Sequence, residues 1–448
     1  EEYDVDVAVI GCGAAGFMAS IVAAQKGMKV LTVEKAGSVA GVNGIKVSGL
    51  WCQDWCGKRV TSFGKRLQWD WHFHKEMYPD LPKHIEELHA RGIKFLGYVN
   101  PYLVNDGELY AEGKKRGVFA KKADGSDYLV DFGEFYCGVV DFTNPEAYNW
   151  FKDEVIKKYT LDIGIDGWMA DFGEYLPTDD LVLANGVSPM IEHNHWPVLW
   201  AKCNYDAVKE SGKLGQVVYF MRAGGTGSQK YCTLLWAGDQ SVDFSRHDGL
   251  CTVICAALSS GMVGCGLNHC DIGGYTSLFD NCRTKEVFLR WAEMAAFMPV
   301  MRTHEGNRPD TNFQYYDDDD CMKQLARLVD IYTMLAPYTK TLVAENAAKG
   351  TPVMRPLFLQ YEDDPRSYTE QFEYLYGPDL LVAPVWQSGK TEWEVYLPSD
   401  EWTHLWTGEH YAKGTHTVPA ELGDTPVFCR KGSQWAELFD SIRAKYGK

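Results

Sequence analysis

The chain has 448 residues, of which 46% are hydrophobic and 23% are charged, and its formal net charge is −17 at pH 7. This length suffices for a large barrel and a smaller domain, and the composition is that of a soluble globular protein. The acidic balance argues against nucleic acid as a partner, because a nucleic-acid-binding face must be basic. No apolar run reaches the roughly 18 residues that predict a membrane span.

The 13 cysteines are an odd number, and several of them lie inside apolar runs. Free cysteine behaves as a small buried hydrophobe, so the pattern favours a reducing, cytoplasmic setting. The first residues, EEYDVDVAVIG, lack the basic segment of a secretory signal. Cys52 and Cys56 have no matching second pair nearby, so we expect no metal site there.

Residues 1–43 carry the pattern of a dinucleotide-binding βαβ fragment. A strand-like run at 5–10 leads into a glycine-rich turn and a helix-like stretch at 17–26, and a second strand at 29–33 ends at an acid. Such glycines let the backbone approach a pyrophosphate, and the acid can hold a ribose hydroxyl. The residues concerned are Gly11, Gly13, Gly16 and Glu34.

This segment resembles the N-terminus of FAD flavoproteins of the fumarate reductase type, including the run VEKAGSVAGVNG. The resemblance ends near Asn43, whereas the fingerprint of such a protein opens a domain of a few hundred residues. A single Rossmann-like βαβ fragment cannot enclose a flavin. We therefore expect the chain to carry no cofactor, and we keep an FAD- or NAD-dependent oxidoreductase as the alternative from another class.

From residue 44 to about residue 360, strand-like runs alternate with helical stretches. This rhythm predicts an α/β fold, a (β/α)8 TIM barrel, in which chemistry sits at the C-terminal ends of the strands. The expected strands are 45–51, 93–99, 164–170, 217–221, 234–237, 262–268, 298–301 and 353–357, and the expected helices include 82–91, 147–158, 196–211 and 321–342.

The last part of the chain, 361–448, has short alternating runs bounded by turn residues. These predict a C-terminal antiparallel β-sandwich domain packed on the barrel, with strands at 380–383, 393–397, 404–406, 415–418 and 427–429. The acidic run 317–320 predicts a solvated loop or a helix start rather than a calcium site.

Two acids follow apolar strand-like runs and form the central hypothesis about chemistry. Asp171 ends such a run in GIDGWMADFGEYLPTD, and Asp239 ends another in LLWAGDQSVDFS. Glycoside hydrolysis uses a pair of carboxylates, one to attack the sugar and one to protonate the departing oxygen. Strand ends also carry Asp simply as a turn residue, which is the alternative for each acid alone. Gln53, Arg222, Asp271 and His304 follow other expected strands.

Residues 44 to about 431 resemble glycoside hydrolase family 31, through VSGLWCQDW, GWMADFGEYLP, WAGDQ, CDIGGY, MRTHEGNRP, GTPVMRPLFL and GPDLLVAPV. The resemblance implies a retaining α-glycoside hydrolase with Asp171 as nucleophile and Asp239 as general acid/base. It implies that Asp271 and His304 bind sugar hydroxyls. We expect Arg222 to orient hydroxyls or the nucleophile, and Trp168 to line the sugar pocket.

Within this family, the chain is most similar to the sulfoquinovosidase branch, through QDWCGKRVTSFGKRLQWDW and DIGGY. The resemblance implies that Gln53, Arg66 and Trp69 face a sulfonate and that Tyr275 reaches it through water. A sulfonate is a permanent anion, which suits arginine with its fixed charge and rigid fork of N–H groups. Without the resemblance, Arg66 would be interpreted as a surface arginine and Trp69 as a core aromatic.

The predicted substrate is a small α-glycoside such as sulfoquinovosyl glycerol, and no nucleic acid or membrane is expected as a partner. The chain could form a homo-oligomer. An α-glucosidase or α-xylosidase with a neutral pocket is the alternative within the family, and a binding protein on an inactive barrel is a further one. Family members carry a β-sandwich before the barrel, and here the flavoprotein-like segment takes that place.

Overall fold

The computed structural model describes residues 7–10, 30–33, 47–61, 64–232 and 234–448. They fall into two compact units, the first ending at Thr233 and the second beginning at Leu234. In the first unit, β1 (Val7–Ile10) and β2 (Val30–Val33) pair in parallel, as a βαβ fragment requires. The predicted dinucleotide-binding residues Gly11, Gly13, Gly16 and Glu34 lie outside the described residues.

A parallel ladder forms the centre of the first unit. The strand β6 (Lys94–Val99) pairs with β3 (Gly49–Trp51) on one side and with β11 (Gly167–Ala170) on the other, and β11 pairs with β13 (Val218–Met221). β11 is buried along its whole length, as expected of a parallel strand covered on both faces. At Gly167 a Cβ would lie 2.0 Å from the carbonyl oxygen of Val218, so only glycine permits this pairing.

Helices and smaller strands complete the first unit. The helical segments are α2 (Leu81–Ala90), α3 (Glu108–Arg116), α4 (Pro145–Trp150), the π-helical η2 (Phe151–Leu161), α5 (Pro189–Glu192), α6 (Trp196–Glu210) and the short η3 (Ser228–Lys230). The smaller strands are β4 (Lys58–Thr61), β5 (Gly64–Leu67), β7 (Tyr102–Val104), β8 (Lys121–Lys122), β9 (Leu129–Asp131), β10 (Tyr136–Val139) and β12 (Leu181–Val182).

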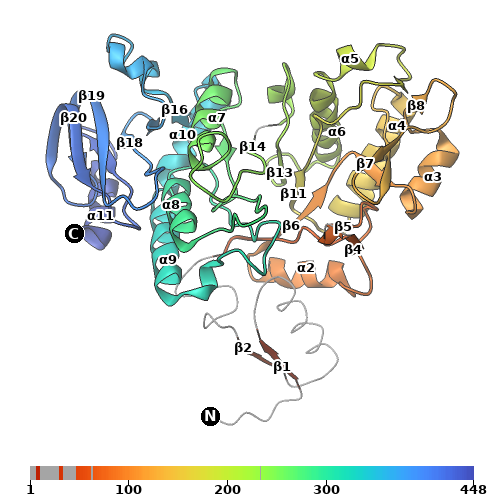
Figure 1. Ribbon diagram of the computed structural model, residues 1–448, viewed down its shortest axis with the longest axis horizontal. Helices are drawn as coiled ribbons and strands as arrows, with labels where there is room; N and C mark the ends of the chain where they lie inside the picture. Colours follow the sequence, from red (N-terminus) through yellow and green to blue (C-terminus); the bar gives the residue numbers. More distant parts are fainter. Residues whose placement is uncertain (1–6, 11–29, 34–46, 62–63, 233) are drawn as a thin grey trace. The chain divides into compact units, whose positions relative to one another are not determined.

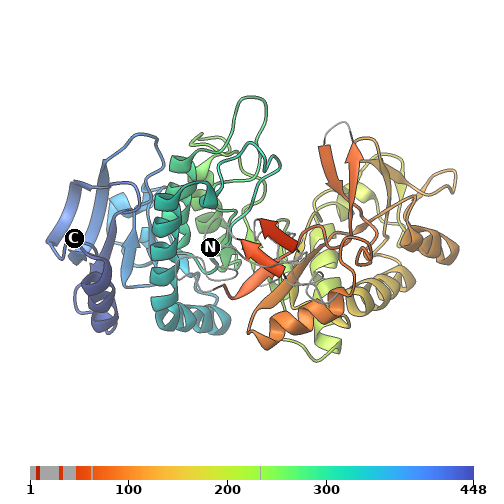
Figure 2. The ribbon, with the colours of Figure 1, turned by 90° about the horizontal axis from the view of Figure 1, so that it is seen from below.

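Two of these small strand groups carry residues of interest. β4 and β5 form an antiparallel hairpin in which Arg59 lies opposite Arg66, and Figure 2 shows the two strands side by side. β10 pairs antiparallel with β7 and β9, so the chain between β6 and α4 folds into a small sheet of its own. The expected helix at 147–158 is α4 continued by η2.

The second unit begins with a parallel pair, β14 (Leu235–Trp236) and β15 (Asn268–His269). A single parallel bridge, from Ile272 to Thr303, extends this pattern to the next segment of chain. The helices are α7 (Leu250–Met262), α8 (Lys285–Ala295), α9 (Asp319–Met334), α10 (Ala336–Lys349) and α11 (Ala436–Tyr446), with short turns η4 (Tyr315–Asp317), η5 (Leu357–Leu359) and η6 (Pro365–Tyr368).

Two predictions of secondary structure in the helical part of this unit need correction, and one is confirmed. The strand expected at 262–268 is shorter, because α7 continues to Met262. The single helix expected at 321–342 is two helices joined at Leu335, since Pro337 fits only the first turn of a new helix. The acidic run starts a helix as predicted, with Asp318 capping α9.

The C-terminal part of the second unit is an antiparallel sheet in the order β16, β17, β18, β21, β19, β20. Its strands are β16 (Met354–Arg355), β17 (Tyr374–Tyr376), β18 (Leu380–Val382), β19 (Glu392–His404), β20 (His410–Pro419) and β21 (Val427–Arg430). Figure 1 shows the long strands β19 and β20 side by side, with α11 nearby.

This sheet is built around a core that includes Leu375, Leu381 and Phe428. The run at 353–357, expected as a barrel strand, instead joins this sheet, because β16 pairs antiparallel with β17. Within the described ranges, none of the helices combines the length and the apolar character that crossing a bilayer requires.

Candidate active site

Asp171 is the first residue after β11. Its backbone N–H continues the ladder by donating to the carbonyl of Val99 at 2.9 Å, so the strand pairing fixes where the side chain begins. The next residue, Phe172, has a φ of 60°, a left-handed conformation that is strained for a bulky side chain. The turn lets the Phe172 N–H donate to Asp171 Oδ1 at 2.8 Å.

Two further groups hold the Asp171 carboxylate, which is 7% exposed. The Tyr98 hydroxyl donates to Oδ2 at 2.5 Å, and Arg222 Nη1 lies 3.3 Å from Oδ1. Arg222 also pairs with Glu174 at 2.5 Å, which fixes the guanidinium. Burial raises the pKa of Asp171 above its ordinary value, while the charge of Arg222 and the hydrogen bond from Tyr98 act in the opposite direction. The arrangement suits a fixed, buried nucleophile.

An aromatic cluster connects this carboxylate with the hairpin β4–β5. The ring of Trp69, which follows the hairpin, packs against Phe172 at 5.3 Å and against Phe135 at 5.3 Å between centroids. The guanidinium of Arg66 lies over the same Phe135 ring, 5.9 Å from its centroid. Arg222 covers the Phe172 ring at 4.2 Å. Two residues predicted to face the substrate anion, Arg66 and Trp69, therefore share contacts that reach the residue next to Asp171.

The two arginines of the hairpin differ in their partners. Arg59 is paired with Asp106 at 2.8 Å and donates to Gln68 at 3.2 Å. Arg66 makes no ion pair within the part of the chain that the structure describes, and it is half-buried. The half-buried Gln53 lies on the turn after β3. A half-buried guanidinium without a carboxylate suits an external anion.

Trp168 has a different environment from the one predicted. Its indole N–H donates to Asn204 of α6 at 2.8 Å, and its ring stacks on Tyr219 at 5.8 Å. The side chain is 0% exposed. This placement is that of a core residue between the sheet and α6, so the geometry does not support the predicted contact with a sugar.

In the second unit, three predicted site residues follow neighbouring parallel segments. Asp239 comes shortly after β14 and is exposed, and its carbonyl accepts a hydrogen bond from the Thr276 hydroxyl at 2.7 Å. Asp271 comes two residues after β15 and is buried. His304 follows Thr303, which is bridged in parallel to Ile272. Carboxyl ends of parallel segments meet at one edge, so this unit brings the three side chains to the same edge.

His304 has a defined tautomer. Its Nδ1 accepts the backbone N–H of Gly306 at 2.8 Å, so in the neutral ring the proton is on Nε2. Burial lowers the pKa of His304 to about 4, which keeps the ring neutral near pH 7. The ring of Tyr275 packs edge-on against it at 4.9 Å. Nε2–H is thus a donor suited to a hydroxyl group of a sugar.

The prediction missed two residues that position Asp271. Arg302 Nη2 lies 2.5 Å from Asp271 Oδ1, and Arg302 Nε donates to His269 Nε2 at 3.2 Å. His269 in turn donates from Nδ1 to the carbonyl of Leu235 at 3.0 Å. Burial and the charge of Arg302 lower the pKa of His269 well below its ordinary value. A neutral histidine therefore orients the arginine, and the arginine orients the carboxylate.

The prediction also missed Tyr98, because it lies inside an apolar strand where a tyrosine is ordinarily a core residue. In the sequence, only the polar residue Asn100, directly after that strand, indicated that this strand end could belong to the site.

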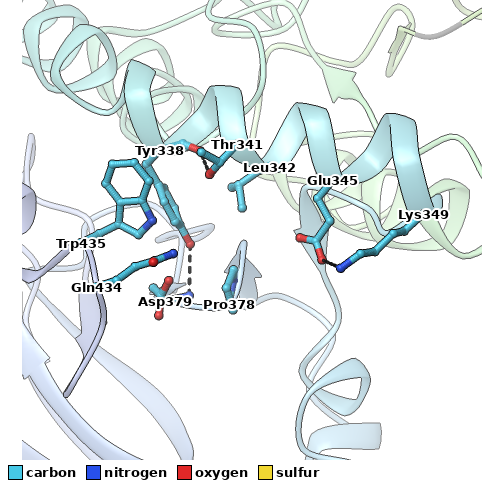
Figure 3. A pocket seen from close by; sticks show the side chains of 9 residues that line it. All are labelled: Tyr338, Thr341, Leu342, Glu345, Lys349, Pro378, Asp379, Gln434 and Trp435. Carbon is cyan, nitrogen blue, oxygen red and sulfur yellow. Dashed lines mark hydrogen bonds and ion pairs between the residues drawn. The ribbon is translucent and has the colours of Figure 1, made fainter.

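Two surface hollows do not contain the predicted catalytic residues. One, of about 400 Å³, lies in the first unit and is bordered by Tyr128 and by Tyr175 on the loop after Asp171. The other, of about 320 Å³, lies in the second unit beside α10 (Figure 3). Its polar groups bond within the protein: the Asp379 N–H donates to the Tyr338 hydroxyl at 3.1 Å, and Lys349 pairs with Glu345 at 3.5 Å. The candidate catalytic residues therefore lie at strand ends, outside both hollows.

Comparison with known families gives two matches. Residues 40–342 match the model described as the glycosyl hydrolases family 31 TIM-barrel domain, and residues 350–433 match the glycosyl hydrolase family 31 C-terminal domain. The barrel model thus covers the candidate residues from Gln53 to His304. The flavoprotein resemblance of residues 1–43 finds no support in these matches.

Several relatives are similar over most of the chain. The sulfoquinovosidase of Escherichia coli K12 is 56% identical over 401 residues, which cover 90% of this chain and 59% of that protein. The sulfoquinovosidase of Agrobacterium fabrum is 57% identical over 402 residues, covering 89% and 60%. The α-xylosidase XylQ of Lactiplantibacillus pentosus is 30% identical over 392 residues, covering 85% and 49%.

A solved structure is similar over nearly the whole chain. It is a family 31 sulfoquinovosidase from E. rectale in complex with the aza-sugar inhibitor IFGSQ, with a TM-score of 0.90 and 71% identity, covering 98% of this chain and 63% of that one. The chain spans about 60% of the length of the sulfoquinovosidases that it matches.

Proposed function

The chain belongs to glycoside hydrolase family 31, and from this premise we propose that it is a retaining α-glycosidase that acts on α-sulfoquinovosides. Relatives named sulfoquinovosidases are 56% to 71% identical to it, whereas the α-xylosidase XylQ is 30% identical. This difference supports the sulfoquinovosidase branch over a neutral-sugar enzyme.

The observation that carries the proposal is the environment of Arg66. Its guanidinium has no carboxylate partner among the described residues, and it shares the Phe135 ring with Trp69. Trp69 in turn packs on Phe172, the residue after Asp171. A sulfonate cannot lose its charge near neutral pH, so its pocket needs a permanent cation, whereas the C6 hydroxyl of a glucoside would leave that cation unpaired.

The proposed reaction is a double displacement. Asp171 attacks the anomeric carbon while Asp239 protonates the departing glycosidic oxygen, and a glycosyl ester forms on Asp171. Asp239 then takes a proton from water, and that water cleaves the ester. Asp271, held by Arg302, accepts hydrogen bonds from sugar hydroxyls, and the Nε2–H of His304 donates one. In this proposal, these contacts orient the bound sugar.

We further propose that the parallel strands belong to a (β/α)8 barrel that does not include the run at 353–357, because that run pairs with β17 instead. The parallel pairs formed by β3, β6, β11 and β13 in the first unit, and by β14 and β15 in the second, support this form.

The test compares p-nitrophenyl α-sulfoquinovoside with p-nitrophenyl α-glucoside as substrates of the purified protein. We expect kcat/KM to favour the sulfoquinovoside by at least a hundredfold. In Asp171→Asn, the fold should be kept and kcat should fall by several orders of magnitude, because covalent catalysis stops. A preference for the glucoside would refute the substrate assignment, and more than about a tenth of wild-type kcat in Asp171→Asn would refute the nucleophile.

A further inference from the structure

A chain of three hydrogen bonds leads from the end of β6 to the nucleophile. The backbone N–H of Tyr102 donates to Asn100 Oδ1 at 3.0 Å, Asn100 Nδ2 donates to the Tyr98 hydroxyl at 3.3 Å, and that hydroxyl donates to Asp171 Oδ2 at 2.5 Å. A backbone N–H can only donate, so it fixes which end of the Asn100 amide faces Tyr98. The amide N–H₂ then occupies a lone pair of the tyrosine oxygen. The direction of every proton in the chain follows from the backbone.

The Tyr98 hydroxyl therefore donates its proton to Asp171 and cannot accept a hydrogen bond from it. Burial and the neighbouring charge of Asp171 raise the pKa of this hydroxyl well above its ordinary value, so it keeps its proton throughout the working pH range. Hydrogen bonds from a neutral donor to a carboxylate are shorter and stronger than those between neutral groups, as the 2.5 Å distance illustrates.

The two oxygens of Asp171 differ in their surroundings. Oδ1 receives the Phe172 N–H at 2.8 Å and faces Arg222 Nη1 at 3.3 Å. Oδ2 receives the hydroxyl of Tyr98, its one donor among the described residues. A glycosyl ester has a carbonyl oxygen, which accepts hydrogen bonds well, and an alkyl oxygen, which accepts them poorly. Oδ1 is thus suited to become the carbonyl oxygen, and Oδ2 keeps a lone pair for attack.

We propose that Tyr98 is a further catalytic residue, which selects Oδ2 of Asp171 as the attacking oxygen and stabilises it as the leaving carboxylate when the ester breaks. This inference rests on the proposed function, since it concerns the second step of that reaction. Asn100 is a positioning residue that acts through the Tyr98 hydroxyl.

The bonds and charges in the two steps balance. In the first, Oδ2 donates an electron pair to the anomeric carbon, the glycosidic C–O bond breaks, and the departing oxygen takes the proton of Asp239. In the second, water attacks the anomeric carbon, Asp239 takes the proton of that water, and the C–Oδ2 bond breaks. The electron pair of that bond returns to Oδ2, where the Tyr98 O–H meets the new negative charge. Tyr98 therefore assists the second step most.

The test is Tyr98→Phe, which removes only the hydroxyl. We expect kcat on p-nitrophenyl α-sulfoquinovoside to fall about ten- to a hundredfold, as expected when a charged group loses a hydrogen bond. Because the second step slows most, the glycosyl-enzyme should accumulate. A burst of p-nitrophenol should then precede the steady state, and mass spectrometry should show the added glycosyl group on the intact protein.

A second readout is the pH dependence of kcat/KM. Among the described residues of the first unit, the charged groups that face Asp171 are Arg222, which follows β13, and Glu174, on the loop of Asp171 itself. Tyr98 lies on the opposite side, on β6. The hydrogen bond from Tyr98 lowers the pKa of Asp171, so its loss should move the acidic limb of the profile to higher pH. A residue with a merely structural role would lower the rate without moving this limb.

The matched control is Tyr219→Phe. Tyr219 is another buried tyrosine of the same sheet, and its hydroxyl donates to the carbonyl of Tyr231 instead of a catalytic group. It should lose similar stability in thermal unfolding but show neither the burst nor the shifted limb. Should Tyr98→Phe not fold, Asn100→Ala should show both effects more weakly, because the hydroxyl loses its fixed orientation.

The outcomes separate this inference from the proposed function. If wild type hydrolyses neither the sulfoquinovoside nor the glucoside, the proposed function fails. If wild type is active and Tyr98→Phe, or Asn100→Ala in its place, behaves like Tyr219→Phe, the assignment of Tyr98 is wrong while the function stands.

Discussion

Replacement of Arg66 by methionine tests the proposed specificity most directly, because the structure separates its effect on the substrate from its effect on the fold. Arg66 has no carboxylate partner within the described ranges, so its removal leaves no described carboxylate of the protein without its ion-pair partner. The fold loses only the contact between the guanidinium and Phe135, worth about 0.5–1 kcal/mol for an exposed pair. Methionine keeps an unbranched apolar stem at this position.

The substrate, in contrast, loses its charged partner. Removing one partner of a buried ion pair costs about 3–5 kcal/mol, and because Arg66 is half-buried we take the lower end. About 3 kcal/mol corresponds to about a 150-fold loss in kcat/KM for the α-sulfoquinovoside. For the neutral α-glucoside, which brings no anion, we expect a change of less than about fivefold. The assay is the ratio of the two kcat/KM values in wild type and Arg66→Met.

Arg59→Met serves as the control on the same hairpin. Arg59 lies directly opposite Arg66 and over the same Phe135 ring, at 5.0 Å, but its charge is already paired with Asp106. We expect this variant to keep the preference for the sulfoquinovoside within about threefold, since its guanidinium is not committed to the substrate. If both substrates lose activity in parallel in Arg66→Met, or if Arg59→Met changes the preference as much, the anion is not held by Arg66.

Three further predictions concern other parts of the chain. Asp239→Ala should impair glycosides with poor leaving groups far more than p-nitrophenyl glycosides, and azide should restore part of the turnover on the latter; equal losses without rescue would point to another acid. Burial lowers the pKa of His404 in the folded protein to about 4. As the pH falls, the His404 ring is therefore protonated in the unfolded chain before it is protonated in the folded protein. The contribution of His404 to the free energy of unfolding is complete above about pH 6.5 and is lost as the pH falls towards 4. The urea midpoint of unfolding should therefore drop across this pH range, and it should drop less in His404→Gln. Heat-denatured supernatant should show no flavin absorbance near about 450 nm, whereas one flavin per chain would restore the oxidoreductase hypothesis.

The sequence predicts those features that depend on local pattern. The strand expected at 93–99 is observed as Lys94–Val99, because a short apolar run bounded by turn residues is typical of a buried strand. The position of Asp171 directly after β11 was predicted for the same reason. The acidic run at 317–320 starts a helix because Asp is a strong N-cap and favours the first turn.

The features that escaped prediction depend on contacts between distant segments. Tyr98 and Asp171 are 73 residues apart, and nothing in the run KFLGYV distinguishes a tyrosine that bonds to a distant carboxylate from one that packs in the core. For Trp168 the opposite happened. Because Trp168 is close to Asp171 in the sequence, it was predicted to line the sugar pocket, but the structure places it in the core. Alternation along a strand places neighbours on opposite faces, and the indole bonds to Asn204 of α6 instead.

The Phe172 ring connects Trp69 with the groups around Asp171 in the first unit. Its left-handed backbone turns the chain so that its own N–H can bond to Asp171, and this strain is kept because the side chain is held from several sides. Trp69 packs on one side of the ring and the Arg222 guanidinium lies over it at 4.2 Å. Through this ring, Trp69 is in contact with the two groups that bond to Oδ1 of Asp171, which are the Phe172 N–H and Arg222. Replacement of Phe172 by glycine would relieve the strain and remove that contact, so it should lower kcat on the sulfoquinovoside even where Arg66 is intact, and a variant with unchanged kcat would show that the ring plays no such role.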